Sequence, residues 1–374
     1  MMFFVHPQIQ FNINNLKKVF LSFFKKPDLD FIEKKLNVYF PNKKFIFTDM
    51  GRTAFKLVVE KLKLQNSEII FPAYICDIFY PILKRYNIKP IFIDIELDSF
   101  NIDIDKVLSE RTENTKAVLI SHTYGLPVNL EKLKDLIVIE DCAHLFGSKQ
   151  VGKLGAVAFF SLYKQFPSLR GGLLICPKDW EIKLPKTKFN FRDFISLLNS
   201  FPFFAYIFKL FGSKTPSITE SFIRKEKMLK PAGINSVSLN LFSRHLDSFE
   251  VLLEKRKELA LFLQQELKSL GFKVQNSENN MFCYVSVLMP ERLREKRDQL
   301  VKRLRKEKVF CTRIWHTPII LNPEVQKEYN INSIEFPNSI EAAKRIINFP
   351  LQNHYTEKDI KKIIKALEKT LKKL

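Results

Sequence analysis

Short apolar runs alternate with amphipathic stretches from residue 68 to about residue 176. The runs are apolar at almost every position, as expected for strands that helices cover on both faces. They span residues 68–71, 89–95, 117–121, 137–140, 157–162 and 173–176. Helical stretches such as 77–86 separate the earlier runs, so the pattern predicts an α/β fold. The expected arrangement has three layers, αβα, with a mostly parallel sheet in the middle.

The later chain has a different pattern, which predicts a smaller α+β domain. Long amphipathic helices are expected at 249–270, 293–306 and 357–374, and strands at 281–289 and 310–315. We therefore divide the chain into an N-terminal segment (1–44), a large domain (45–245) and a small C-terminal domain (246–374). A chain of 374 residues suits two domains of this kind.

Two apolar segments stand apart from this pattern. Residues 195–212 are almost uninterrupted in apolar character, but Pro202 divides them and the run is short for a membrane span. Residues 15–26 form a basic amphipathic stretch. We interpret each segment as a buried helix or a helix at a subunit interface. The alternative for each is a helix that lies in the plane of a membrane surface.

The composition narrows the classes of function. The chain carries 61 basic and 40 acidic residues, a net charge of +21. This charge favours anionic partners, although an AT-rich genome explains a Lys-rich and Phe-rich chain equally well. The five cysteines form no C-x-x-C pair and the six histidines form no H-E-x-x-H, so we expect neither a disulfide framework nor a metal site. A reducing cytoplasm fits this cysteine usage, and no signal peptide is recognised.

Ligands of open α/β sheets bind beyond the carboxyl ends of the strands, and four motifs lie at such positions. The first is Gly51-Arg52-Thr53, ahead of a predicted helix, where free backbone amides suit a phosphate group. A plain turn is the alternative. The second is Glu140-Asp141, directly after a buried strand. The Asp141 carboxylate could hold a protonated pyridine nitrogen, or it could cap a following helix.

The third motif contains Ser161 and Lys164, after the run 157–162. A lysine in a sheet-lined cleft can lose its charge through desolvation and form a Schiff base, although most lysines are solvated surface groups. The fourth motif is His122-x-Tyr124-Gly125-x-Pro127. It reads either as a lining of the cleft or as a structural turn.

Taken together and in this order, these motifs resemble the DegT/DnrJ/EryC1/StrS family of sugar aminotransferases. These enzymes use pyridoxal 5′-phosphate (PLP) and have the aspartate aminotransferase fold, fold type I. The resemblance covers about residues 45–372. Further motifs that carry it are Phe71-Pro72-Ala73-Tyr74, Pro90-Ile91-Phe92-Ile93-Asp94, Asn101-Ile102-Asp103, Ala143-His144, Arg297-Asp298-x-Leu300, Phe336-Pro337-Asn338-Ser339 and Asn348-Phe349-Pro350-Leu351.

The resemblance implies a role for each motif residue. Lys164 matches the Schiff-base lysine that also moves the proton, and Asp141 matches the partner of the pyridine nitrogen. Ala143 would pack on one face of the ring, and His144 would lie near the phenolic oxygen of the cofactor. Ser161 and the amides of Arg52 and Thr53, after Gly51, would hold the phosphate. Tyr124, Trp315 and His316 are candidates for substrate contact, with a core position as the alternative for Trp315.

The chain differs from the family pattern, or matches it only in part, at four places. Only two residues separate Ser161 from Lys164, whereas most members have a longer interval. Cys76 occupies the position of the aromatic residue that often stacks on the cofactor. Asn235 is the candidate for the asparagine that members contribute to the neighbouring subunit's phosphate. Residues 179–230 match the family poorly and form a Phe-rich insert.

The resemblance predicts an aminotransferase that moves an amino group from a donor such as glutamate to a nucleotide-linked keto-sugar, in polysaccharide or glycan biosynthesis. A homodimer in the cytoplasm is expected. One alternative is a PLP-dependent sugar dehydratase, although dehydratases of the family replace the lysine with histidine. Another is a protein of the same fold without transaminase activity, in a scaffolding role or in weak contact with the inner face of the membrane. No DNA-reading motif supports a nucleic-acid partner.

Overall fold

The computed structural model describes the chain except for residues 1, 6–10, 12–15 and 212–229. Its central sheet has seven strands in the order β2-β8-β7-β6-β5-β3-β4. Their bounds are β2 Lys44–Thr48, β3 Glu68–Pro72, β4 Lys89–Ile93, β5 Thr115–Ser121, β6 Ile137–Asp141, β7 Val157–Ser161 and β8 Gly172–Cys176. Only β8 is reversed, because it runs antiparallel to both β2 and β7. The mostly parallel sheet is therefore confirmed.

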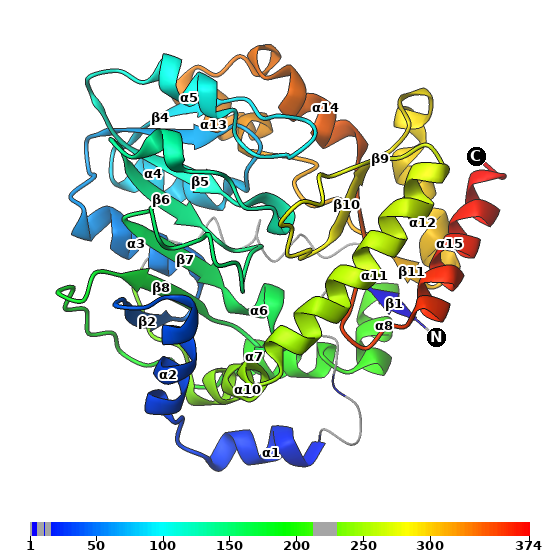
Figure 1. The fold of residues 1–374 in the computed structure, drawn as a ribbon, viewed down its shortest axis with the longest axis horizontal. Helices are drawn as coiled ribbons and strands as arrows, with labels where there is room; N and C mark the ends of the chain where they lie inside the picture. The colour runs from blue at the N-terminus through cyan, green and yellow to red at the C-terminus, as the bar shows by residue number, and fades with distance from the viewer. Residues whose placement is uncertain (1, 6–10, 12–15, 212–229) are drawn as a thin grey trace.

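Helices cover both faces of this sheet (Figure 1). Along β7, Val157 and Phe159 join the core beneath α3, whereas Ala158 and Phe160 join the core beneath α2 and α10. This alternation follows from the two-residue period of a strand. The helices of this part are α1 Leu16–Phe24, α2 Leu29–Tyr39, α3 Gly51–Lys61, α4 Tyr80–Arg85, α5 Ile104–Glu110, α6 Leu162–Gln165, α7 Phe191–Asn199, α8 Pro202–Phe211 and α10 Ser236–Leu246.

A second core surrounds two small sheets. In one, β10 pairs antiparallel with β12 and with β9. In the other, β1 pairs in parallel with β11. The elements are β1 Phe3–Phe4, β9 Lys273–Val274, β10 Val285–Leu288, β11 Val309–Phe310 and β12 Ile346–Phe349, with helices α11 Phe249–Ser269, α12 Arg297–Lys306, α13 Pro323–Tyr329, α14 Pro337–Arg345 and α15 Glu357–Leu371. Strand β1 therefore belongs beside the C-terminal part of the chain.

Helix α11 contributes to both cores. Its first residues, Phe249 and Leu253, pack into the core beneath the large sheet, and Leu259, Leu263 and Leu267 pack into the second core. Figure 1 shows this helix running between the two regions. The boundary near residue 245 stays a prediction, since the two cores share this helix.

Several expected elements are shorter than the pattern suggested. Of the expected strand 310–315, only Phe310 lies in a strand, at the end of β11, and Trp315 lies in a turn with a φ of 59°. The apolar run 195–212 contains the end of α7 and all of α8, separated at Ser200 and Phe201. Residues 15 and 212, at the limits of the two apolar segments, lie outside the described residues. Among the described helices, none has the length and apolar character needed to cross a membrane.

Candidate active site

The carboxyl ends of β5, β6 and β7 bring the first candidates together. These strands are parallel neighbours, and Asp141 pairs in register with Ser121 on one side and Phe159 on the other. Lys164 lies on α6, a single helical turn that begins directly after Ser161. Asp141 ends β6 and Lys164 follows β7, so the two residues lie at the same edge of the sheet on adjacent strands.

Lys164 is half-buried and has a histidine as its polar neighbour. Its Nζ lies 3.1 Å from Nε2 of His144. The ring of His144 is buried, and its Nδ1 faces the backbone N–H of Tyr124 at 3.4 Å. The backbone carbonyl of His144 accepts a hydrogen bond from Gln165 at 2.7 Å. Contacts from both sides thus fix His144 beside the lysine amine.

Asp141 carries a buried carboxyl group with a backbone partner. Its Oδ1 accepts a hydrogen bond from the N–H of Ala143 at 2.9 Å. Burial raises the pKa of Asp141, while the charge of Lys164, the Ala143 N–H and His122 act in the opposite direction. The interpretation of Asp141 as a helix cap is wrong, because turns and not a helix follow β6. In its ionised form, a carboxyl group buried in this way is stabilised by a cationic partner.

The start of α3 lies against the end of β7. A Cβ atom on Gly51 would lie 3.4 Å from the carbonyl oxygen of Phe160 and 3.8 Å from Cβ of Ser161. Ser161 is buried and its side chain makes no capping hydrogen bond to α6. Arg52 is half-buried, and the N–H of Thr53 already donates to the carbonyl of Met50 at 3.1 Å. Gly51, Arg52 and Ser161 thus fit a phosphate better than the Thr53 amide does.

Cys76 lies among the same charges. Burial raises the pKa of the Cys76 thiol to about 11, with Asp77 adding to the rise and Lys164 opposing it. The thiol is therefore protonated at neutral pH. Cys76 provides no aromatic ring at the position where many family members have a residue that stacks on the cofactor.

An aromatic cluster from distant parts of the chain packs around His144. Trp315 has its ring centroid 4.9 Å from that of His144 and 5.6 Å from that of Tyr124. Tyr124 is fully buried and its hydroxyl donates to the carbonyl of Ile314 at 2.7 Å. Trp315 therefore lies at the site, in contact with His144, and the buried Tyr124 packs against Trp315. His316 is exposed and its Nδ1 binds the carbonyl of Arg313 at 2.9 Å, away from this cluster.

The sequence provided no signal for three residues near the site. Tyr284 lies in the run that contains β10, and its buried ring is 5.4 Å from that of His144. Tyr163 precedes the lysine, and Arg192 comes from the Phe-rich insert.

Asn235, the candidate for the neighbouring subunit's phosphate, caps α10. Its side chain accepts a hydrogen bond from the Ser238 N–H at 2.8 Å and donates one to Asp193 at 3.1 Å.

The residues on either side of Asp141 belong to a buried cluster of side chains that could bind a metal ion. The ligand atoms of His122, Glu140 and Cys142 lie within 4.8 Å of one another. Nδ1 of His122 accepts from the N–H of Val128 at 3.0 Å, so Nε2 carries the proton toward Glu140, also at 3.0 Å. The Gly152 N–H donates to the same carboxylate. These bonds support a structural role for the group, and the expectation of no metal stays a prediction.

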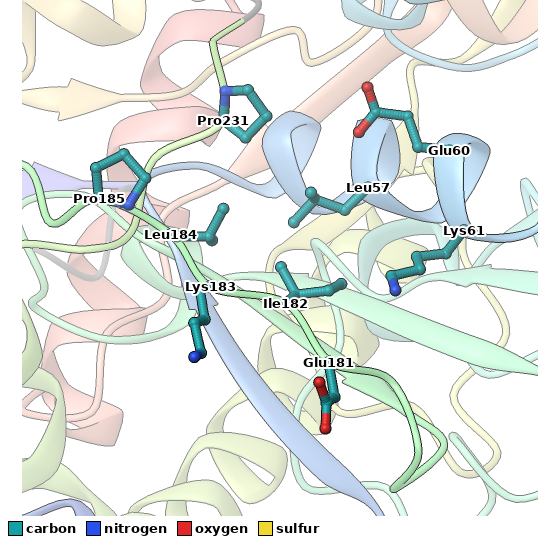
Figure 2. Close-up of a pocket in the computed structure, with 9 residues that line it drawn as sticks. All are labelled: Leu57, Glu60, Lys61, Glu181, Ile182, Lys183, Leu184, Pro185 and Pro231. Carbon is teal, nitrogen blue, oxygen red and sulfur yellow. The ribbon is translucent and has the colours of Figure 1, made fainter.

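A pocket of about 520 Å³ lies on the surface at the far end of α3 (Figure 2). Its lining consists of Leu57, Glu60, Lys61, Glu181, Ile182, Lys183, Leu184, Pro185 and Pro231. None of the candidate site residues is among them. Since Gly51 begins this helix and Lys61 ends it, the pocket is separate from the site around Lys164.

Comparison with protein-family models identifies the family to which the chain belongs. The model of the DegT/DnrJ/EryC1/StrS aminotransferase family matches residues 12–368. The chain belongs to this family. The DegT/DnrJ/EryC1/StrS resemblance and the predicted enzyme class, an aminotransferase, are therefore confirmed.

Individual members of the DegT/DnrJ/EryC1/StrS family agree with this assignment. The chain is 23% identical to the dTDP-4-amino-4,6-dideoxy-D-glucose transaminase of Shigella dysenteriae, over 90% of this chain and 88% of the relative. Its structure is similar to Helicobacter pylori PseC, an aminotransferase involved in the biosynthesis of pseudoaminic acid. The TM-score is 0.75 and the identity 18%, over 100% of both chains.

A further similar structure is E. coli GDP-4-keto-6-deoxy-D-mannose-3-dehydratase with bound hydrated PLP. The TM-score is 0.74 and the identity 18%, over 98% of this chain and 100% of the other. These likenesses confirm the predicted fold class, and the neighbour's bound PLP agrees with the predicted cofactor. The neighbours include both a transaminase and a dehydratase, so the fold does not choose between the two reactions.

Proposed function

We propose that this chain is a PLP-dependent aminotransferase that transfers an amino group to a nucleotide-linked keto-sugar. The observation that carries the proposal is the placement of Asp141 at the end of β6 and of Lys164 directly after the adjacent parallel strand β7, beside the helix start at Gly51. An amine, a buried carboxyl group and a helix N-terminus suit the aldehyde, the pyridine nitrogen and the phosphate of PLP, respectively.

Each site residue then has a role. Lys164 would hold the cofactor covalently and would move the proton at the reacting carbon of the substrate. Asp141 would pair with the protonated pyridine nitrogen, so that bound PLP would withdraw electrons from that carbon. Ser161 and the start of α3 bind the phosphate. Ala143 is half-buried and would cover one face of the ring.

Further residues shape the site around the lysine. His144 orients the Lys164 amine through the 3.1 Å contact and would reach the phenolic oxygen of the cofactor. Trp315 packs on His144 from the C-terminal part of the chain, and because it is only half-buried it is a better candidate for substrate contact than the buried Tyr124. Cys76 leaves room where other members place a ring.

The choice of acceptor rests on relatives and charge. The Shigella dysenteriae relative is named for a dTDP-linked sugar, and a net charge of +21 suits a substrate that carries a diphosphate. An amino donor such as glutamate completes the reaction. The retained Lys164 favours transamination over the dehydratase alternative, because a dehydratase of this family would carry histidine there.

Absorbance of the purified protein tests the proposal. We expect a visible band on addition of PLP, which borohydride shifts and fixes to the protein. Lys164→Ala should lose this band, whereas the exposed Lys153→Ala should keep it. An unchanged borohydride-reducible band in Lys164→Ala would refute the assignment. Incubation with glutamate and a panel of nucleotide keto-sugars then separates transamination from dehydration.

The proposal includes a homodimer in the reducing cytoplasm. Apolar side chains of α1, α7 and α8 are exposed in the single chain, and burial against a second copy would remove them from water. They are Leu16, Phe20, Leu21, Phe23, Phe24, Phe191, Phe194, Phe203, Phe204 and Phe208. Light scattering of a Phe20→Ser, Phe24→Ser variant tests this, with a shift to monomer expected. Flotation with anionic vesicles would instead support the membrane-surface alternative.

A further inference from the structure

The turn that follows β5 (residues 122–125) is fixed on its first side by bonds to the large sheet. The N–H of His122 donates to the carbonyl of Asp141 at 3.1 Å. The N–H of Thr123 donates to the side chain of the buried Asn101 at 2.9 Å. The first half of the turn therefore has a fixed position relative to the carboxyl ends of the strands.

The second half of the same turn is held by the C-terminal part of the chain. The Cys283 N–H donates to the carbonyl of Tyr124 at 3.1 Å, and the Met281 N–H donates to that of Gly125 at 2.8 Å. Tyr124 has a φ of 58° and Gly125 a φ of 104°. A bulky residue such as Tyr124 adopts this left-handed conformation only where its surroundings impose it.

One peptide of the turn directs its N–H toward the active site. It joins Thr123 to Tyr124, and its carbonyl oxygen accepts a hydrogen bond from the buried Gln275 side chain at 2.8 Å. Because the peptide is trans, its N–H points away from that oxygen. The Tyr124 N–H faces Nδ1 of His144, with 3.4 Å between the two nitrogens. The His144 ring stacks on the Tyr124 ring, with centroids 5.6 Å apart, so the direction of Nδ1 is fixed.

This contact bears on which ring nitrogen of His144 carries a proton. A ring nitrogen that faces an N–H donor acts as an acceptor, and in a neutral imidazole the other nitrogen then carries the hydrogen. For His144 the other nitrogen is Nε2, which lies 3.1 Å from Nζ of Lys164. An N–H donor on Nε2 can bond to Nζ only through a lone pair, which an ammonium group lacks.

We propose that Tyr124 is a positioning residue whose backbone N–H holds His144 in the tautomer protonated at Nε2, so that a donor faces the Lys164 amine. This donor matches the uncharged amine, which is the form that attacks an aldehyde. The use of the tautomer rests on the proposed function, in which His144 would also reach the phenolic oxygen of the cofactor. That oxygen, when ionised, requires a donor as well.

Nuclear magnetic resonance of the cofactor-free full chain reads the tautomer directly. The histidines are labelled with ¹⁵N, and long-range ¹H–¹⁵N correlations distinguish a ring protonated at Nε2 from one protonated at Nδ1. Comparison with His144→Gln assigns the signals of His144 among those of the six histidines. At pH 8 we expect the Nε2-protonated pattern. A ring protonated at Nδ1, or at both nitrogens, overturns the proposal.

Two substitutions separate the Tyr124 backbone from its ring. Tyr124→Gly keeps the N–H and accepts the left-handed φ, so the tautomer should persist. Its loss would show that the ring and not the N–H sets it. Gly125→Ala adds a Cβ atom 2.8 Å from the backbone nitrogen of Cys283 and must displace the turn. We expect the ratio of Nε2-protonated to Nδ1-protonated rings to fall roughly 5- to 10-fold, the equivalent of one hydrogen bond.

Gly271→Ala is the matched control for an alanine at positive φ. Gly271 has a φ of 84°, and its added Cβ atom would lie 3.8 Å from Cγ of Pro290. The tautomer ratio of His144 should be unchanged in this variant. An equal change in Gly271→Ala and Gly125→Ala would contradict a specific effect of the turn. If Gly125→Ala does not fold, the wild-type and Tyr124→Gly spectra still decide.

Addition of PLP separates this inference from the proposed function. The visible band should form more slowly in Gly125→Ala, in parallel with the loss of the Nε2-protonated fraction. An unchanged rate despite an altered tautomer ratio would show that the tautomer does not act on Lys164, and would overturn the inference. Absence of any band in the wild-type chain, with the expected tautomer present, would sink the proposed function and leave the positioning of His144 standing.

Discussion

The carboxyl group of Asp141 is buried, and it accepts a hydrogen bond from the backbone N–H of Ala143. Because burial raises its pKa, the folded chain favours the neutral carboxyl group, and the stability from this group is lost as the pH rises through the folded-state pKa. Asp141→Asn removes this cost and keeps an oxygen for the Ala143 N–H. We expect cofactor-free Asp141→Asn to be more stable at pH 7 by about 1 kcal/mol.

Thermal unfolding of the cofactor-free protein between pH 4 and pH 8 measures this effect. The stability gain of Asp141→Asn should grow with pH, while transaminase activity should fall steeply because the pyridine nitrogen loses its ionic partner. Glu131→Gln, an exposed carboxyl substitution, is the control. A pH-independent difference would show that Asp141 is not the titrating group.

Single residues also show how far sequence reasoning reaches. Lys164, Asp141 and Gly51 were identified because each follows a recognisable strand or precedes a helix. Arg192 was not, because its position depends on Arg170 and Asp193, which meet only after folding. For Trp315 the sequence does not distinguish substrate contact from a core position, because nothing local indicates that it lies in a turn with positive φ beside His144.

At the scale of elements, the junction of β2, β8 and α3 sets the geometry of the phosphate end. A Cβ atom on Gly172 would lie 2.5 Å from Oγ1 of Thr48 and 2.6 Å from the Met50 carbonyl. Gly172→Ala must therefore displace the backbone before Gly51. We expect a loss of about 1–3 kcal/mol in unfolding free energy and weaker binding of PLP. Denaturant unfolding and PLP titration measure the two effects.

Gly233→Ala is the matched control for this junction. Its added Cβ atom would lie no closer than 3.4 Å to a neighbouring atom, the carbonyl oxygen of Phe47. Its stability should therefore change by less than that of Gly172→Ala. Equal effects of the two substitutions would contradict the proposed displacement of α3.

The buried strands were the most predictable elements, because short continuous apolar runs rich in β-branched and aromatic residues are expected for strands covered on both faces. The reversal of β8 was not apparent, since strand direction depends on the connection and not on the apolar pattern. Strands β1 and β11 have only two residues each, which is too short for a period to be recognised. The resemblance supplied the cofactor and the reaction, which the pattern alone could not.

At the scale of the whole molecule, β1 joins the N-terminal region to the second core. The Phe4 ring stacks on Phe310 with centroids 4.8 Å apart, and only 2% of Phe4 is exposed. Its backbone binds Tyr355 at 2.9 Å and Gln352 at 2.8 Å. Phe4→Ala should lower the unfolding free energy by about 3 kcal/mol, with Ile334→Ala, 77% exposed, as the near-neutral control.

Hydrogen exchange locates this effect. Amides of β11 and of the start of α15 should exchange faster in Phe4→Ala, while those of β5 and β6 should be unchanged. Loss of protection throughout the large sheet would indicate that β1 supports the entire fold and not the second core alone.

The pairing of β1 also has a consequence for how the chain is made. The Phe4 N–H and the Tyr355 hydroxyl that accepts it are 351 residues apart, so on the ribosome β1 emerges long before its partners. A contact of such long range forms late and contributes little to the rate-limiting nucleus. During synthesis, Phe3 and Phe4 must stay exposed until the C-terminal part arrives, and a chaperone that shields this apolar pair would raise the yield of folded chain.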